Sequence, residues 1–251
     1  MNKLFVSVLA LGLSFMVCKG QEKKEQLIDP KLTEVWEPKV PKVTPGKDHT
    51  APSDAIVLFD GSNFDNWING KGATAEWTLN ADGSMTVKPK TGGIRTKQTF
   101  GSMQLHIEWR SPEKVEGKSG QGLGNSGVFI QGRYEIQVLD NNDNETYSNG
   151  QVGSVYKQSI PLAMASVPTG AWNSYDIIYH QPEFDEQGKV TKKATITVLH
   201  NGVLIQDHFE IQGPTVYRGE PSYKAHGKGP IFLQDHGDLV SYRNIWIREL
   251  N

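Results

Sequence analysis

Short runs in which apolar and polar residues alternate recur along most of the chain, and turn residues separate them. In the run from 102 to 110, SMQLHIEWR, the residues Met103, Leu105, Ile107 and Trp109 alternate with polar ones. Successive side chains of a strand point to opposite faces, so this run predicts a strand with one buried face. No window keeps a helical period, and the pattern therefore favours an all-β protein.

Turn signals between the runs predict antiparallel pairing. Asn201 and Gly202 lie between two apolar runs and suit the positive φ angles of a type I′ hairpin. About ten or more such strands, with long connections such as residues 141–171, predict a two-sheet antiparallel jelly-roll sandwich.

The stretch from 123 to 141, LGNSGVFIQGRYEIQVLDN, contains two short runs joined through Gly132 and Arg133. Its spacing predicts a tight hairpin. In the second run, Glu135 and Gln137 lie on the face opposite the apolar residues. Two interpretations stay open, because this face is either the solvated side of an ordinary strand or part of a polar site.

A second stretch, GPIFLQDHGDLVSYRNIWIREL, repeats this arrangement near the other end of the chain. Extended geometry places Gln234 and His236 on one face and Leu233 and Asp235 on the other. His236 lies where the strand ends, and the ends of strands in a rigid sheet often carry sites. A lone His is more often structural, but one beside a carboxylate is a candidate general base.

Composition narrows the function classes. A chain of 251 residues with 37% hydrophobic content can form one sandwich domain. A formal charge of −2 gives no electrostatic reason to expect nucleic acid or an anionic membrane as partner. The chain has no Gly-rich phosphate loop, HExxH, CxxC or G-x-S-x-G motif, which argues against nucleotide-dependent transferases, zincin proteases and common serine esterases.

Residues 1–20 are typical of a secretory signal peptide, since the apolar run from 4 to 17 is shorter than the ~20 residues that span a bilayer. We therefore expect export to the periplasm or the cell surface. Cys18, the only cysteine, leaves a lipoprotein anchor open, although Val17 stands where such signals usually place a small residue. Lys, Glu and Pro dominate residues 21–53, which predicts a tether or strap before a domain at 54–251.

Five motifs together resemble one family, the 3-keto-disaccharide hydrolase domain. They are LFDGSNFDNW, NSGVFIQGRYEIQVLD, WNSYDIIY, NGVLIQD and GPIFLQDHGDLVSYRNIWIREL, and the resemblance runs from about Ala55 to Leu250. It implies a concanavalin A-like jelly roll with a sugar-binding groove in its concave sheet, and action on glycosides oxidised to a ketone at C3. The matching polar residues are Asn125, Ser126, Glu135, Gln137, Gln234, Asp235, His236 and Arg243.

A C3 ketone acidifies the hydrogen on C2, so one base can remove it while an acid assists departure of the C1 oxygen. Water then adds to the resulting enone. We expect Glu135 and His236 to be the catalytic pair, with either one as the base. The expected substrate contacts, which hold hydroxyls or the enolate oxygen, are Asn125, Ser126, Gln137, Tyr156, Gln234 and Arg243.

Two alternatives remain open from the sequence. No cofactor is required, but a divalent cation held by Glu135, Asp235 and His236 could polarise the ketone. The domain could instead be a lectin-like module without catalysis, because this fold also serves sugar binding. In that case exposed tryptophans would stack on sugar rings, and the candidates are Trp67, Trp77 and Trp172.

Overall fold

The computed structural model describes residues 29–113 and 116–250, and the chain divides into two compact units, Met1–Lys42 and Val43–Asn251. The described part of the first unit holds one short 3-10 helix, η1 (Pro30–Thr33). In the described part of the chain, no helix is long and apolar enough to cross a bilayer. The signal peptide and Cys18 lie outside the described residues, so export and lipidation stay predictions.

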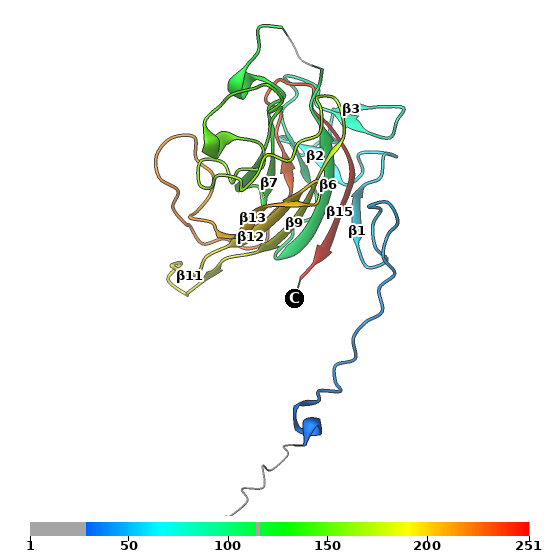
Figure 1. The fold of residues 1–251 in the computed structure, drawn as a ribbon, viewed down its shortest axis with the longest axis vertical. Helices are drawn as coiled ribbons and strands as arrows, with labels where there is room; N and C mark the ends of the chain where they lie inside the picture. Colours follow the sequence, from blue (N-terminus) through cyan, green and yellow to red (C-terminus); the bar gives the residue numbers. More distant parts are fainter. Residues whose placement is uncertain (1–28, 114–115, 251) are drawn as a thin grey trace, which may run out of the picture. The chain divides into compact units, whose positions relative to one another are not determined.

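The second unit is built on two antiparallel sheets (Figure 1). The strand order of the larger sheet is β13-β12-β9-β6-β15-β4-β3, and β1 also pairs with β15. Its strands are β1 (Ile56–Phe59), β3 (Thr78–Leu79), β4 (Met85–Thr86), β6 (Met103–Arg110), β9 (Asn173–His180), β12 (Thr195–His200), β13 (Val203–Glu210) and β15 (Ser241–Glu249).

The smaller sheet has the order β2-β5-β14-β7-β8. Its strands are β2 (Trp67–Asn69), β5 (Ile94–Thr96), β14 (Phe232–Leu233), β7 (Ser126–Ile130) and β8 (Tyr134–Val138). The remaining elements are the hairpin β10 (Glu183–Phe184) and β11 (Val190–Lys192) and the short helices η2 (Gly120–Gly122) and η3 (Ser148–Gly150). The predicted all-β jelly-roll sandwich is confirmed.

Strand alternation builds the core between the two sheets. The apolar residues of β6 are at most 1% exposed, as the sequence pattern predicts. The predicted hairpin at Asn201 and Gly202 is also confirmed, because these two residues connect the paired His200 and Val203 with φ angles of 51° and 79°. The β7–β8 hairpin forms as predicted, with a three-residue loop between Ile130 and Tyr134.

Tyrosines of the larger sheet reach through the core to the smaller one. The Tyr242 hydroxyl donates to Oγ of Ser126 at 2.6 Å, and the Tyr175 hydroxyl donates to the carbonyl oxygen of Gln137 at 2.7 Å. Both contacts lie on the inner side of the β7–β8 hairpin. They hold the hairpin from the core side, so the side chains on its outer face are not needed for this contact.

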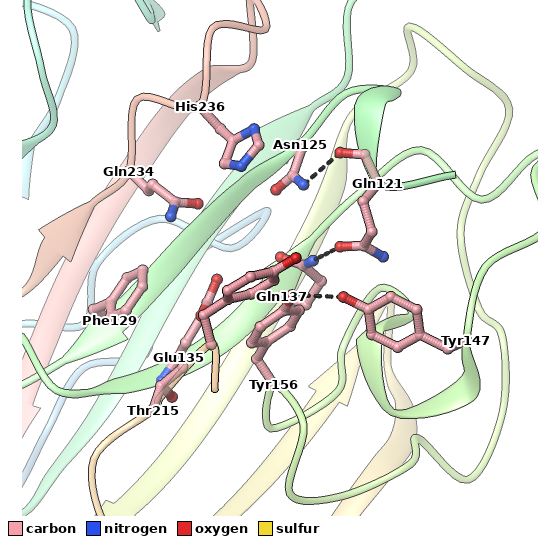
Figure 2. A pocket seen from close by; sticks show the side chains of 11 residues that line it. Gln121, Asn125, Phe129, Glu135, Gln137, Tyr147, Tyr156, Thr215, Gln234 and His236 are labelled. Atoms are coloured by element: carbon pink, nitrogen blue, oxygen red, sulfur yellow. Dashed lines mark hydrogen bonds between the residues drawn. The ribbon is translucent and has the colours of Figure 1, made fainter. Parts of the chain in front are cut away.

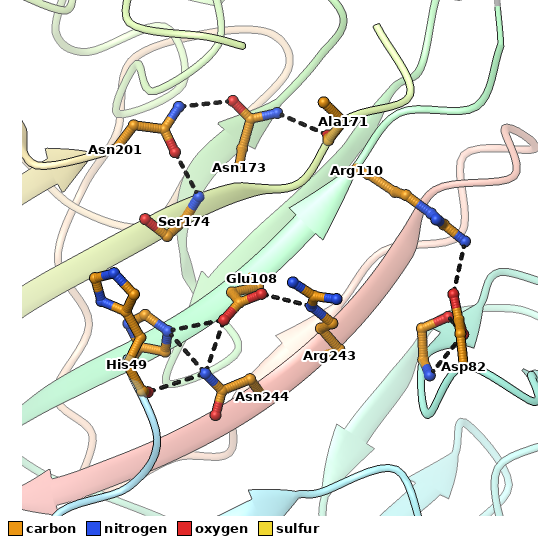
Figure 3. Close-up of polar contacts among 12 residues, drawn as sticks. His49, Asp82, Glu108, Arg110, Ala171, Asn173, Ser174, Asn201, Arg243 and Asn244 are labelled. Atoms are coloured by element: carbon orange, nitrogen blue, oxygen red, sulfur yellow. Dashed lines mark hydrogen bonds and ion pairs between the residues drawn. The ribbon is translucent and has the colours of Figure 1, made fainter. Parts of the chain in front are cut away.

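The polar face of β6 is covered as well, although the sequence pattern suggests a solvated side. His106 is completely buried, and the ring of His49 stacks on it with centroids 5.6 Å apart. The carbonyl oxygen of His49 accepts hydrogen bonds from Asn244 and Trp246 of β15 at 2.9 and 3.0 Å. His49 therefore lies against β6 and β15 of the larger sheet (Figure 3).

Candidate active site

A cavity of about 520 Å³ opens on the outer face of the smaller sheet (Figure 2). Most of the residues that the sequence proposes for a site line this single cavity. The lining residues are Gln121, Asn125, Phe129, Glu135, Gln137, Tyr147, Tyr156, Thr215, Tyr217, Gln234 and His236. The two proposed catalytic residues thus face one sugar-sized space, although they come from segments 101 positions apart in the sequence.

Glu135 lies on β8 with its side chain on the outer face, but only 5% of the residue is exposed. The interpretation of this face as a solvated one is therefore wrong. Its backbone N–H donates to Oγ1 of Thr215 at 3.0 Å, and Thr215 in turn donates its backbone N–H to the carbonyl of Arg133 at 2.8 Å. The segment that carries Thr215 follows the edge of β8 and helps to exclude water from the carboxyl group.

Burial raises the pKa of Glu135 to about 8. Within residues 29–113 and 116–250, no donor hydrogen-bonds its carboxyl group, so nothing compensates the loss of hydration. Most molecules consequently carry a neutral carboxyl group at this position at pH 7. A buried carboxylic acid that faces a cavity is suited to donate a proton there.

Gly127 on β7 makes room for this carboxyl group. A methyl group at Gly127 would come within 2.7 Å of Oε1 of Glu135 and within 2.9 Å of the Phe129 ring. The Glu135 side chain therefore extends over the glycine, where it lines the cavity. This contact gives the glycine of the NSG motif a physical role.

Amide side chains form the polar floor of the cavity. Nε2 of Gln137 donates to Oε1 of Gln121 at 2.9 Å, and Nδ2 of Asn125 donates to the carbonyl oxygen of Gln121 at 2.6 Å. The Oε1 atoms of Gln137 and Gln234 are buried and have no hydrogen-bond partner among the described residues. Buried polar atoms normally have partners, so these two oxygens are candidate acceptors for a ligand's hydroxyl groups.

His236 is exposed at the mouth of the cavity, and no hydrogen bond from a described residue holds its ring. The neighbouring Asp235 does not face the cavity. Its carboxylate accepts the backbone N–H groups of Gly92 at 3.0 Å and Gly237 at 2.9 Å, and so supports the loop that carries His236. Glu135, Asp235 and His236 do not come together as a ligand set, and the described residues contain no cluster of three His, Cys, Asp or Glu residues that could hold a metal ion.

Two of the expected substrate contacts lie elsewhere. Ser126 is fully buried and faces the core, where it donates to the carbonyl oxygen of Gln234 at 2.7 Å. Arg243 follows Tyr242 on β15, and because Tyr242 points into the core, Arg243 points away from it. Its Nε lies 2.5 Å from Oε2 of Glu108 (Figure 3), and Arg243 does not line the cavity.

The sequence interpretation missed Gln121, Phe129, Tyr147, Thr215 and Tyr217. Alternation in β7 could have identified Phe129, because it shares a face with Gly127. The other four lie outside regular strands, where no hydrophobic period marks a residue as facing a cavity. Tyr156, which was expected, is confirmed as a lining residue, and its hydroxyl lies 2.5 Å from that of Tyr147.

The tryptophans proposed for a lectin do not line the cavity that contains Glu135. Trp67 and Trp77 are 0% and 3% exposed in the core. The ring of Trp172 lies against the guanidinium groups of Arg110 and Arg243, at 4.6 and 4.2 Å. The expected exposure of Trp67 and Trp77 is therefore wrong, whereas Trp172 is half-buried.

Comparison with known proteins identifies the family of this chain. Residues 54–248 match the family model of the 3-keto-alpha-glucoside-1,2-lyase-like domain. The chain belongs to this family. The resemblance inferred from the five sequence motifs is thereby confirmed. The names of the family and of its members support a glycoside-active enzyme at the family level.

Relatives of this 3-keto-alpha-glucoside-1,2-lyase-like domain extend the comparison. A 3-keto-disaccharide hydrolase from Bacteroides thetaiotaomicron is 26% identical over 241 residues, which cover 80% of this chain and 81% of that protein. A solved structure from Parabacteroides distasonis ATCC 8503, assigned as a glycosyl hydrolase, is 53% identical with a TM-score of 0.85, and the match covers 89% of this chain and 97% of that one. A second structure from the same organism, with 21% identity, a TM-score of 0.58 and coverage of 79% and 94%, shares the fold.

Proposed function

We propose that this protein cleaves 3-keto-glycosides by elimination followed by hydration. The observation that carries the proposal is that a buried carboxyl group with a pKa of about 8, Glu135, and an exposed imidazole, His236, line one cavity. Ordinary glycosidases usually need two carboxyl groups beside the scissile bond. Here Glu135 is the carboxylic acid on the outer face of β8, and its neighbour on that face, Gln137, is an amide. A ketone at C3 of the substrate removes the need for a second carboxyl group.

In the elimination, His236 accepts the C2 proton, and the C2–H electron pair forms an enolate with the C3 ketone. The enolate electrons then form the C1–C2 double bond while the bond from C1 to the leaving oxygen breaks. Glu135 gives its proton to that oxygen, since its raised pKa keeps it protonated at neutral pH. The step leaves an imidazolium at His236 and a carboxylate at Glu135.

Hydration reverses these proton transfers. The Glu135 carboxylate takes a proton from water as the water oxygen bonds to C1, and His236 returns a proton to C2. Both residues regain their starting states, and the net reaction is hydrolysis of the glycoside. The unpartnered oxygens of Gln137 and Gln234 accept hydrogen bonds from sugar hydroxyls, and the amide N–H groups of Gln234 are donors for the enolate oxygen.

A panel of glucosides tests this function. Wild-type protein should release the aglycone from a 3-keto-glucoside and leave the matching unoxidised glucoside intact. Glu135→Gln and His236→Ala should each lower kcat/KM by ~10²–10⁴, the usual worth of a placed acid or base. Retention of an unoxidised glycan without any cleavage of the keto compound would support the lectin-like alternative and contradict the proposal.

A further inference from the structure

A second hollow lies on the same face of the smaller sheet as the cavity that contains Glu135. The register pairs Glu135 with Phe129, Phe129 with Phe232, and Phe232 with Arg95. Directly paired residues of neighbouring strands project from the same face, so these four side chains form one row. Three strand spacings of about 4.8 Å place Arg95 roughly 14 Å from Glu135 along that row.

Two aromatic rings lie between the two hollows. The rings of Phe129 and Phe232 meet edge to face with centroids 5.4 Å apart. Each ring lies over a glycine, since a methyl group at Gly93 would come within 2.3 Å of the Phe232 ring and one at Gly127 within 2.9 Å of the Phe129 ring. Both rings remain partly exposed, and they provide an apolar surface from one hollow to the next.

The second hollow, of about 550 Å³, is positively charged. Arg95 and Arg133 line it together with Phe232, and no carboxylate is among its lining residues. Arg95 is exposed, and no described residue forms an ion pair or hydrogen bond with its side chain. Arg133 donates one N–H from Nη1 to the carbonyl of Gln131 at 2.7 Å, which leaves its other donors available.

We propose that the substrate's leaving group crosses Phe129 and Phe232 and ends in an anionic group held by Arg95 and Arg133. Guanidinium groups bind carboxylate, sulfate and phosphate through paired hydrogen bonds, and an aglycone that spans the row brings such a group to them. This inference rests on the proposed function, because Glu135 fixes the end of the row at which the glycosidic bond is cleaved. It assigns the substrate class as 3-keto-glycosides with long, anionic leaving groups.

Matched substrates test the inference. We would compare 3-keto-glucosides of one extended aryl aglycone that ends in a carboxylate, a sulfate, a phosphate or a neutral primary amide. Wild-type protein should show a kcat/KM at least about tenfold higher for one or more of the anions than for the amide, mainly through KM, and this preference should fall as salt rises. The anion with the highest kcat/KM identifies the anionic group that Arg95 and Arg133 bind.

Variants complete the test. Arg95→Gln should remove most of the preference for the anion while leaving kcat/KM for the amide unchanged. Lys192→Gln, which removes an equal charge from the exposed β10–β11 hairpin, should change neither value. Equal kcat/KM for anionic and neutral substrates, or an unaltered preference in Arg95→Gln, would overturn the inference and leave the proposed function standing. If no keto-glycoside is cleaved, the proposed function fails, and the inference fails with it.

Discussion

The carboxyl group of Glu135 lies directly over Gly127, and a methyl group at Gly127 would come within 2.7 Å of its Oε1. The position of the acid therefore depends on the absence of a side chain on the neighbouring strand. In this way a buried strand residue can present its carboxyl group to the cavity without a hydrogen-bond partner among the described residues.

Gly127→Ala should displace the acid without disrupting the sheet. We expect kcat/KM for a 3-keto-glucoside to fall by about 10- to 100-fold, because a shift of about 1 Å can have an effect of this size. The control is Gly227→Ala, since a methyl group at Gly227 meets no atom within 4 Å. Near-wild-type kinetics for Gly127→Ala would show that the observed position of Glu135 is not needed for turnover.

Glu135 should make the stability of the protein depend on pH. Burial raises its pKa to about 8, above the ordinary value of 4.5, so the folded protein binds more protons than the unfolded chain between pH 4.5 and 8. The free energy of unfolding therefore decreases as pH rises through this window, by on the order of 5 kcal/mol at most. Glu135→Gln should greatly lower turnover yet raise Tm relative to wild type at pH 8.5, with little difference at pH 4.5. A variant that is destabilised at pH 8.5 would contradict the assigned protonation state.

His106 should add a second, separate pH dependence. Burial acts to lower its pKa, but hydrogen bonds and charges from Asp176 and Glu108 outweigh burial and raise it to about 8. A raised pKa stabilises the fold fully below pH 6.5, and this contribution of about 2 kcal/mol is lost as pH rises through 8. Thermal unfolding of Glu135→Gln with and without His106→Gln isolates the effect. The pH profile above 6.5 should flatten in the double variant, and an identical slope in both proteins would rule out this role.

Arg243 should be dispensable for turnover. It lies against Glu108 and Trp172 on the outer side of the larger sheet, away from the cavity. Arg243→Gln should keep kcat/KM for a 3-keto-glucoside within about twofold of wild type and lower the free energy of unfolding by about 1 kcal/mol, because Glu108 loses an ion-pair partner. A large rise in KM with unchanged stability would instead restore Arg243 as a substrate contact.

The sequence predicted those site residues whose placement follows from strand alternation. Glu135, Gln137, Gln234 and His236 all lie on the face that a two-residue period assigns to them. Ser126 was expected at the cavity from the family motif, but it shares the inner face of β7 with Val128, and there it accepts a hydrogen bond from the hydroxyl of Tyr242, 116 positions away. Family motifs mark positions that matter to the fold as well as to the chemistry.

The burial of polar side chains was harder to predict from the sequence than the face of the strand on which they lie. The sequence leaves open a solvated Glu135, because the segment that covers it, around Thr215, lies 80 positions away and carries no periodic signal. The same holds for His106, which His49 covers from a Pro-rich stretch that the sequence marks only as a tether or strap. Chain segments without a periodic pattern thus determine which polar groups are buried. For Glu135, this burial also raises the pKa of the carboxyl group.

Proton exchange at C2 distinguishes elimination and hydration from direct hydrolysis of the glycosidic bond. Wild-type protein is incubated with a 3-keto-glucoside in D₂O, and the released sugar is analysed by NMR, with the free product in D₂O without enzyme as a control. We expect aglycone release to be accompanied by deuterium at C2, because the C2 proton passes to the exposed His236, exchanges there with D₂O, and is replaced by a deuteron in the hydration step. Release of the aglycone with protium retained at C2 would show that the bond breaks by another route and would contradict the roles given to His236 and Glu135.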